Sequence, residues 1–330
     1  MPTRSADTAG ELVRAALGTA VRSSAPLAGG TYNAVHDLVL DDGRRAVLKV
    51  APPPDRPRMG HEQDLLSAEA MFDERARGAL GGVLPEVLAH GSVPGEPGRE
   101  YLLLGHLPGS LLNQVDLAAG DRKVVRRELG QAVARLHTVT GSEFGYLTQP
   151  RLRAPTWPAA FGAMVEEVVA DADRYGVELP AGGGAAVLGR VRSNLGHLEV
   201  VRTPILVHFD LWDGNVLVGD GAGPPRLTGI IDAERAFWGD PVAELVSLAL
   251  TGDIRDDAAL LEGYREAGGA ADLGPPALRR LALYRIYLWL IMLTETTPRG
   301  YDRARTERVW EWVGRRLQED LAEIAAPVAG

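Results

Sequence analysis

The hydrophobic pattern of this chain changes character near residue 110, and this change restricts the fold more than any other feature. Before that point, short apolar runs predict strands at 34–40, 46–50, 83–90 and 100–104, and one helical pattern occurs at 60–77. After it, helical periodicity dominates, at 121–139, 157–175, 184–200, 241–250, 256–267, 276–296 and 302–325. Strands gathered at one end and helices at the other predict an α+β fold of two lobes.

The boundary near residue 110 also predicts the domain organisation. We expect residues 1–104 to form a small lobe on an antiparallel sheet, with a polar start and a short helix over 1–25. Residues 105–110 are expected to be a hinge linker. Residues 111–330 are expected to form a large helical lobe, interrupted by a strand-like stretch at 205–231. A cleft between two such lobes is a common location for a ligand.

The charge and the absence of cysteine exclude several functions. The 330-residue chain has a formal net charge of −9, which argues against a nucleic-acid partner because such binding usually needs a basic face. With no cysteine, neither a disulfide nor a thiolate metal site can form. The N-terminus lacks an apolar stretch of signal-peptide length, and the most apolar run, 281–293, is too short for a bilayer. We therefore expect a cytoplasmic enzyme without a membrane partner, and the sequence leaves its oligomeric state open.

The segment 207–218 carries the strongest chemical signal. It delivers Asp210 and Asn215 from one loop, and Asp232 follows the next apolar run. Phosphoryl transfer needs oxygen ligands for Mg²⁺ and a carboxylate that orients the attacking hydroxyl. The spacing therefore predicts Asp210 as the catalytic base and Asn215 with Asp232 as magnesium ligands. Taken singly, each could be a turn-forming residue, and His208 could be a buried structural histidine.

Lys49 lies inside the apolar run 46–50, which is unusual in a chain with only one other lysine. A cation on such a strand can reach the phosphates of a nucleotide if a helix carboxylate holds it. Glu69 is the predicted partner from the helix at 60–77, with Glu62 as the rival on the same face. The alternative is a lysine on an edge strand that points into water.

Motifs of other enzyme classes are absent from the sequence. There is no phosphate-binding Gly-x-x-x-x-Gly-Lys-Ser/Thr loop and no dinucleotide-binding Gly-x-Gly-x-x-Gly between a strand and a helix. His61-Glu62 has no second histidine four residues on, and no Gly-x-Ser-x-Gly elbow occurs. Zinc proteases and serine hydrolases of these types are therefore excluded.

The pattern around the catalytic segment resembles the aminoglycoside phosphotransferase and choline kinase-like family, whose fold is that of the protein kinases. The similarity extends from about residue 27 to about residue 250. It rests on the stretches 208–215, 230–236, 239–241, 244–245, 129–137 and 144–145. The resemblance implies a protein-kinase-like fold, Mg²⁺ as cofactor, ATP or GTP as phosphate donor, and the hydroxyl of a small molecule as acceptor.

The resemblance also implies roles for individual residues. Asp210 is implied as the base, Asn215 and Asp232 as magnesium ligands, and Lys49 as the phosphate-binding lysine held by Glu69.

Further contacts are implied on the nucleotide side and behind the catalytic loop. The purine would lie on the linker against the backbone of Gly105 and Leu107, and the phosphates under the loop of Gly30 and Thr31. Asp240 would brace the catalytic loop from behind.

Two departures from the family pattern occur in the catalytic loop. Phe209 stands where glycine is common, and Trp212-Asp213 stands where His-Pro is frequent. Neither departure removes a catalytic group. The loop over 29–31 also lacks the full glycine pattern of protein kinases.

The acceptor is less well defined by the sequence. Asp213, Glu234 and Trp238 flank the catalytic segments and are the predicted acceptor contacts; Trp157, Glu166, Asp171 and Tyr287 are further candidates. The family resemblance favours an antibiotic acceptor of aminoglycoside, nucleoside or peptide type. The alternatives are a metabolic or repair kinase for an amino alcohol, a homoserine-like compound or a sugar adduct, and an inactive nucleotide-binding module.

Overall fold

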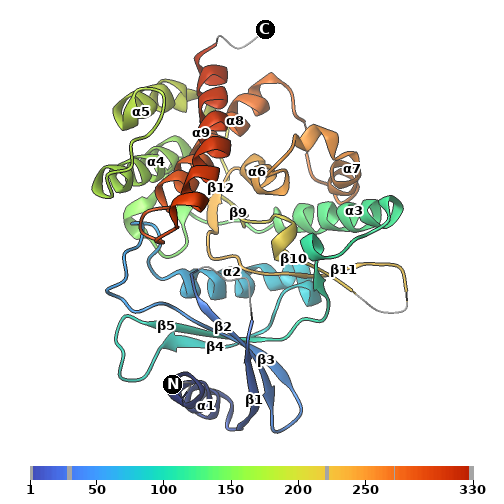
Figure 1. Ribbon diagram of the computed structural model, residues 1–330. Helices are drawn as coiled ribbons and strands as arrows, with labels where there is room; N and C mark the ends of the chain where they lie inside the picture. Colours follow the sequence, from blue (N-terminus) through green and yellow to red (C-terminus); the bar gives the residue numbers. More distant parts are fainter. Residues whose placement is uncertain (1–2, 28–31, 220–222, 271, 327–330) are drawn as a thin grey trace.

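The computed structural model describes residues 3–27, 32–219, 223–270 and 272–326. Its strands and helices separate into two lobes, with a five-stranded sheet at the bottom of Figure 1 and most helices at the top. Helix α2 (Leu65–Leu80) lies between the two. This arrangement confirms the predicted two-lobed α+β architecture.

The sheet of the small lobe is antiparallel throughout, with the strand order β1-β2-β3-β5-β4. Its strands are β1 (Val21–Pro26), β2 (Ala34–Leu40), β3 (Arg45–Val50), β4 (Val87–Ser92) and β5 (Glu100–Gly105). Helix α1 (Thr3–Leu17) precedes the sheet. The predicted short helix within residues 1–25 is confirmed, but the prediction is wrong from Val21 onward, where β1 begins. The sequence of β1 is mostly exposed and has no apolar alternation, so only its pairing with β2 makes it a strand.

Helix α2 contributes to the apolar packing of both lobes. Leu66 and Ala70 pack with Leu102 and Leu104 of the sheet, whereas Phe72 belongs to the core of the helical lobe. The helix begins later than the periodicity from residue 60 predicts, because Asp64 has a left-handed backbone conformation that interrupts the helical path.

The helical lobe contains the predicted long helices. They are α3 (Ala119–Leu136), α4 (Trp157–Arg174), α5 (Gly183–Asn194), α6 (Glu244–Leu248), α7 (Ala258–Glu266), α8 (Pro275–Thr294) and α9 (Arg303–Ala325). The helix expected over 241–250 is shorter than predicted and follows a 3₁₀ turn at Pro241–Ala243. Within the described ranges, no helix is both long and apolar enough to cross a membrane.

Two small sheets in the helical lobe carry the chemically important loops. One has the order β11-β10-β6 and the other β8-β7-β12-β9. Their strands are β6 (Ser110–Leu111), β7 (Phe144–Tyr146), β8 (Arg153–Ala154), β9 (Ile205–Val207), β10 (Val216–Val218), β11 (Leu227–Ile230) and β12 (Phe237–Gly239). With two to four residues each, these strands are too short to show a periodicity of their own. Only the stretch that contains β9, β10 and β11 was predicted.

Candidate active site

The loop between β9 and β10 brings two of the three predicted catalytic groups into contact. The Asn215 side-chain amide donates to the Asp210 carbonyl at 2.7 Å and to its carboxylate at 3.2 Å. The backbone N–H of Ile231 donates to the carbonyl of Asn215 at 3.0 Å, so the end of β11 lies against this loop. Asp232 is the next residue. Asp210, Asn215 and Asp232 therefore converge, as the spacing predicts.

Lys49 joins the two lobes at the same place. Its Nζ lies 2.6 Å and 2.8 Å from the two carboxylate oxygens of Glu69, and 2.6 Å from Oδ1 of Asp232. The lysine is 7% exposed and lies on β3, between β2 and β5. The predicted pairing with Glu69 is thus confirmed, and the alternative of an edge-strand lysine facing water is wrong. Glu62 pairs with Arg299 instead.

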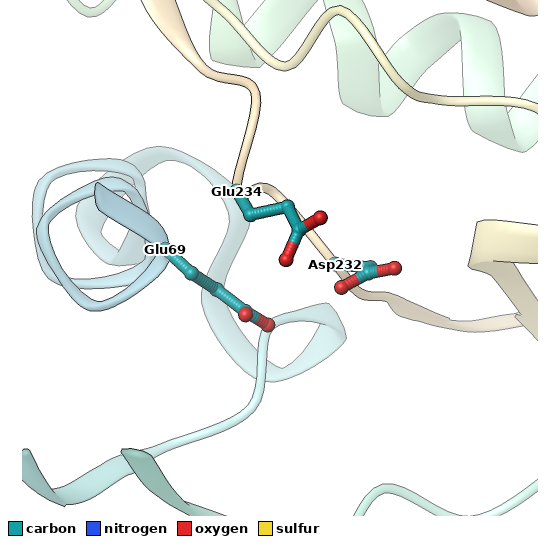
Figure 2. A group of neighbouring side chains, drawn as sticks. All are labelled: Glu69, Asp232 and Glu234. Atoms are coloured by element: carbon teal, nitrogen blue, oxygen red, sulfur yellow. The ribbon is translucent and has the colours of Figure 1, made fainter. Parts of the chain in front are cut away.

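A third carboxylate lies beside this ion pair. Figure 2 shows Glu69, Asp232 and Glu234 pointing toward one another, and one carboxylate oxygen from each lies within 4.8 Å of the others. The Glu234 carboxylate also accepts a 2.9 Å hydrogen bond from the side chain of Asn33. Three acidic groups with a single lysine form a site that attracts a further cation.

The pKa values around Lys49 reflect this crowding. Burial alone would lower the pKa of Lys49, but the Asp232 and Glu69 carboxylates raise it above its usual value. Burial and the negative charge of Asp232 raise the pKa of Glu234 to about 8. Without an additional cation, this raised pKa favours the protonated form of Glu234 at neutral pH.

Asp210 also has a perturbed pKa. Burial raises it to about 7; Arg235 opposes this shift, and the Asp232 carboxylate adds to it. A carboxylate with a pKa near neutrality accepts a proton more readily than an ordinary aspartate, which suits a general base. Perturbed carboxylates in a cleft are also a sign of a functional site.

Two residues of the site have left-handed backbone conformations that are costly for side chains other than glycine. Phe209 has φ 62° and Asp232 has φ 67°, at a cost on the order of 1–2 kcal/mol each. The buried Phe209 ring packs against Phe237 at 4.9 Å and Tyr287 at 5.7 Å between ring centroids. The position where glycine was expected thus needs the backbone freedom of glycine, and aromatic packing offsets the strain.

Glu244 holds the catalytic loop from behind, a role that the sequence analysis gave to Asp240. The Glu244 carboxylate accepts hydrogen bonds from the N–H groups of His208 at 2.7 Å and Phe209 at 3.0 Å. Asp240 instead accepts from Arg280 at 2.7 Å and from the Tyr284 hydroxyl at 2.8 Å. The prediction for Asp240 is corrected accordingly. Burial raises the pKa of Glu244 to about 7, against the effect of the two N–H donors.

His208 is the buried structural histidine that the alternative interpretation described. It is fully buried, and its Nε2 lies 3.0 Å from the carbonyl of Ile231. Nε2 must therefore carry the proton, which leaves Nδ1 to accept the 3.3 Å contact from the N–H of Asp210. Burial lowers the pKa of His208 to about 4. The ring is neutral and fixes the backbone of the loop.

Two of the three predicted acceptor contacts have other partners. Asp213 pairs with Arg122 at 2.8 Å and Arg126 at 3.1 Å, both from α3. Trp238 is buried in β12, and its indole lies against Gly141. Both side chains therefore have partners within the helical lobe, and their contact with an acceptor stays a prediction.

The four further candidates for acceptor binding also have structural roles. Trp157 and Tyr287 are fully buried in the core. Glu166 pairs with Arg192 at 2.8 Å, and Asp171 accepts the backbone N–H of Gly60 at 2.7 Å. Sequence position alone could not separate these residues from a binding surface.

The predicted nucleotide contacts outside Lys49 and Glu69 have mixed outcomes. Gly30 and Thr31 lie outside the described residues. The N–H of Gly105, the last residue of β5, donates to the carbonyl of Glu86 at 2.8 Å and is not available to a purine. The predicted purine contact of the Gly105 and Leu107 backbone therefore stays a prediction, with the Gly105 carbonyl as the group concerned. The side chain of Leu107 lies beside Gly229 of β11.

The described features are those of a phosphotransferase with a protein-kinase-like fold. They are a small antiparallel sheet, a strand lysine held by a helix carboxylate, and an Asp–Asn–Asp group at the edge of a helical lobe. Comparison with known proteins agrees with this class. The model of the phosphotransferase enzyme family matches residues 24–284, and the chain belongs to this family. The predicted family, fold and enzyme class are thereby confirmed.

Two curated proteins illustrate the relationship. Viomycin phosphotransferase of Streptomyces vinaceus is 27% identical over 191 residues, which cover 58% of this chain and 62% of that protein. The match therefore spans less than two thirds of that relative. A candidate ketoamine kinase of Synechocystis is also 27% identical, over 270 residues that cover 79% of this chain and 80% of that protein.

Solved structures share the whole fold. A candidate fructosamine-3-kinase from Thermobifida fusca has a TM-score of 0.64 at 21% identity, with 94% of this chain and 98% of that chain covered. A thermostable mutant of aminoglycoside phosphotransferase APH(4)-Ia, in ternary complex with AMP-PNP and hygromycin B, has a TM-score of 0.63 at 19% identity. The match covers 97% of this chain and 99% of that chain.

Proposed function

We propose that this enzyme transfers the γ-phosphate of ATP or GTP to a hydroxyl group of a small molecule, with Mg²⁺ bound in the cleft. The observation that carries the proposal is the 2.6 Å contact between Lys49 and Asp232, which joins the two lobes beside the loop where Asn215 bonds to Asp210. Phosphoryl transfer depends mainly on positioning and on charge stabilisation. These residues supply a cation for the phosphates, anions for the metal, and a carboxylate for the acceptor hydroxyl.

The donor set around Asp232 fits magnesium. Mg²⁺ prefers oxygen ligands from carboxylates, amides and phosphates, and Asp232 and Asn215 offer such oxygens. Glu234 adds a carboxylate oxygen within 4.8 Å of those of Glu69 and Asp232, and burial together with the Asp232 charge raises its pKa, an effect that a bound cation would oppose. We therefore propose Glu234 as an additional metal ligand, in place of its predicted contact with the acceptor. The bound ion would neutralise the charge that develops on the phosphates.

Side chains of the protein would bind the phosphates and activate the acceptor hydroxyl. Lys49, held extended by Glu69, would bind the α- and β-phosphates, and Asp210 would orient and accept the proton of the attacking hydroxyl. We assign residues 105–110 as the hinge, and expect the purine to contact the Gly105 carbonyl and the Leu107 backbone.

We propose an antibiotic as the acceptor, on the basis of the viomycin phosphotransferase relative and of the structural neighbour that binds hygromycin B. A ketoamine is the second candidate, favoured by the longer match to the ketoamine kinase relative. Both acceptor types are polyhydroxylated and carry amino groups. Trp212, two residues after Asp210 and 36% exposed, offers an aromatic face suited to a sugar ring or a cation.

A substrate panel with γ-labelled ATP and GTP tests this proposal. It contains viomycin, hygromycin B, other aminoglycosides, nucleoside antibiotics and fructosylated amines, each with and without Mg²⁺. We expect label on one antibiotic class, only with Mg²⁺ and not with the Asp210→Asn variant. Label confined to fructosylated amines would assign the second candidate. Tight nucleotide binding without transfer to any compound would instead support a binding module and contradict the proposal.

A further inference from the structure

Residues 58–64, here called the docking segment, come from the small lobe but are bound by side chains of the helical lobe. The carbonyl of Arg58 accepts from the Tyr175 hydroxyl at 2.6 Å. The N–H of Gly60 donates to Asp171 at 2.7 Å, and its carbonyl accepts from Arg151 at 2.8 Å. The carbonyl of Gln63 accepts from the Gln149 amide at 2.7 Å. The chain immediately before α2 is therefore fixed to the helical lobe.

The docking segment also makes a buried ion pair with the helical lobe. Glu62 Oε1 lies 2.5 Å from Arg299, and the two side chains are only 2% and 7% exposed. Buried charges interact more strongly than exposed ones, and removal of one partner leaves the other buried without compensation. This pair therefore holds the docking segment much more firmly than a surface ion pair would.

The ion pair continues toward the catalytic groups. Arg299 also lies 3.3 Å from Glu295, whose carboxylate lies 2.9 Å from Arg235. Arg235 follows Asp232 by three residues, on the loop that carries the proposed metal ligands. From Asp232, a second route leads through Lys49 and Glu69 into α2. Since the docking segment leads directly into α2, the two routes connect the same helix to the loop of Asp232 from both of its sides, through ion pairs and short stretches of backbone.

We propose that the ionic chain Glu62–Arg299–Glu295–Arg235 positions α2, and through Glu69 positions Lys49, for the nucleotide. None of these four residues has to touch the nucleotide; they are positioning residues. The proposal rests on the nucleotide role proposed above for Lys49. It also explains why Glu62, the rival partner for Lys49 in the sequence, is buried away from that lysine: it fixes the start of the helix that carries the true partner.

Arg299→Gln is the direct test, because it removes the central cation and keeps a polar side chain. The first measurement is hydrogen exchange of the protein without ligand, and the second is calorimetric binding of Mg·AMP-PNP, with Mg·GMP-PNP in parallel. We expect faster exchange over residues 58–80 with little change in α3. We also expect the nucleotide Kd to rise on the order of tenfold.

Arg285→Gln is the matched control. Arg285 forms a partly buried ion pair with Asp320 at 2.6 Å, between α8 and α9 and outside the ionic chain. This variant should leave both the exchange over 58–80 and the nucleotide Kd at wild-type values. If it loosens α2 as much as Arg299→Gln does, the effect is general destabilisation and the proposal fails.

A double variant keeps the test valid if Arg299→Gln folds poorly. In Glu62→Gln/Arg299→Gln no unpaired buried charge remains at the docking segment, so thermal stability should recover while α2 still exchanges faster. Wild-type exchange over 58–80 in a folded variant would overturn the proposal. If the wild type binds neither nucleotide, the proposed function fails. The exchange data then still decide whether the ionic chain positions α2.

Discussion

Glu69 on α2 accepts two close contacts, at 2.6 Å and 2.8 Å, from the Nζ of Lys49 on β3. The two residues come from elements that pack in different layers, and the ion pair is almost completely buried. The pair therefore fixes the position of the Lys49 ammonium group, where Asp232 contacts it from the other lobe at 2.6 Å.

Glu69→Gln should weaken nucleotide binding about tenfold or more, because breaking a buried ion pair typically costs a few kcal/mol. Lys49 would keep Asp232 as its partner and would move toward it. Calorimetry with Mg·AMP-PNP measures the effect, and Glu74→Gln, an exposed change on the same helix, is the control. Equal affinities for these two variants would show that Glu69 does not hold the lysine for the nucleotide.

The sequence predicted the groups of this site better than it predicted their supports. Asp210, Asn215 and Lys49 could be predicted because each is unusual for its place in the sequence; a lysine within an apolar strand is an example. The role of Glu244 could not be predicted in this way. A glutamate at the start of a helix is ordinary in a sequence, and only the fold shows that it binds two N–H groups of the catalytic loop.

The elements of the fold also differ in how well the sequence predicts them. Long amphipathic helices such as α9 are visible in the sequence because their apolar residues repeat with the helical period. Strands β1 and β12 are not, because β1 is exposed and β12 has only three residues. Their conformation comes from their neighbours. Trp238 is an example. Because β12 could not be predicted from the sequence, a buried tryptophan of this strand was interpreted as a ligand contact beside the catalytic segments.

Glu234→Gln should reduce the enhancement of nucleotide affinity by Mg²⁺ while leaving metal-free nucleotide binding nearly unchanged. The substitution removes a negative charge next to the proposed ion and keeps the side-chain size. Asp232→Ala should nearly abolish the enhancement, and Asn215→Ala should lower it least, since a neutral ligand is lost. Calorimetry with and without Mg²⁺ gives this ranking. If Mg²⁺ enhances nucleotide affinity in Glu234→Gln as much as in wild type, Glu234 is not a metal ligand, and its originally predicted contact with the acceptor is favoured.

Glu244→Gln should lower kcat roughly 10- to 100-fold. The amide NH₂ of glutamine would face the buried N–H of either His208 or Phe209, which costs about 1–3 kcal/mol and would displace the catalytic loop. Its effect on nucleotide Kd should be small, since Glu244 holds the acceptor side of the site through His208 and Phe209. Steady-state kinetics and calorimetry together separate the two effects. A folded variant with wild-type kcat would contradict the positioning role.

His61→Phe should make the protein more resistant to acid. His61 is 2% exposed and stacks on Tyr146, and burial lowers its pKa to about 4. The unfolded chain binds a proton near pH 6.5 that the folded chain does not, so wild-type stability is lost as the pH falls through this window. Relative to wild type, the variant should gain about 1.4 kcal/mol per pH unit between 6.5 and 4. Urea unfolding at a series of pH values measures this difference, and a pH-independent difference would show that His61 does not titrate as described.

The turnover of Asp210→Asn, measured with the acceptor that the panel identifies, tests the central claim most directly. The amide has nearly the same shape as the carboxylate but cannot accept the hydroxyl proton, so Mg·nucleotide affinity should stay within a few-fold of wild type while phosphoryl transfer falls by two orders of magnitude or more. Retention of more than about a tenth of kcat, a barrier increase below about 1.4 kcal/mol, would contradict the role of Asp210 as the base and with it the proposed mechanism.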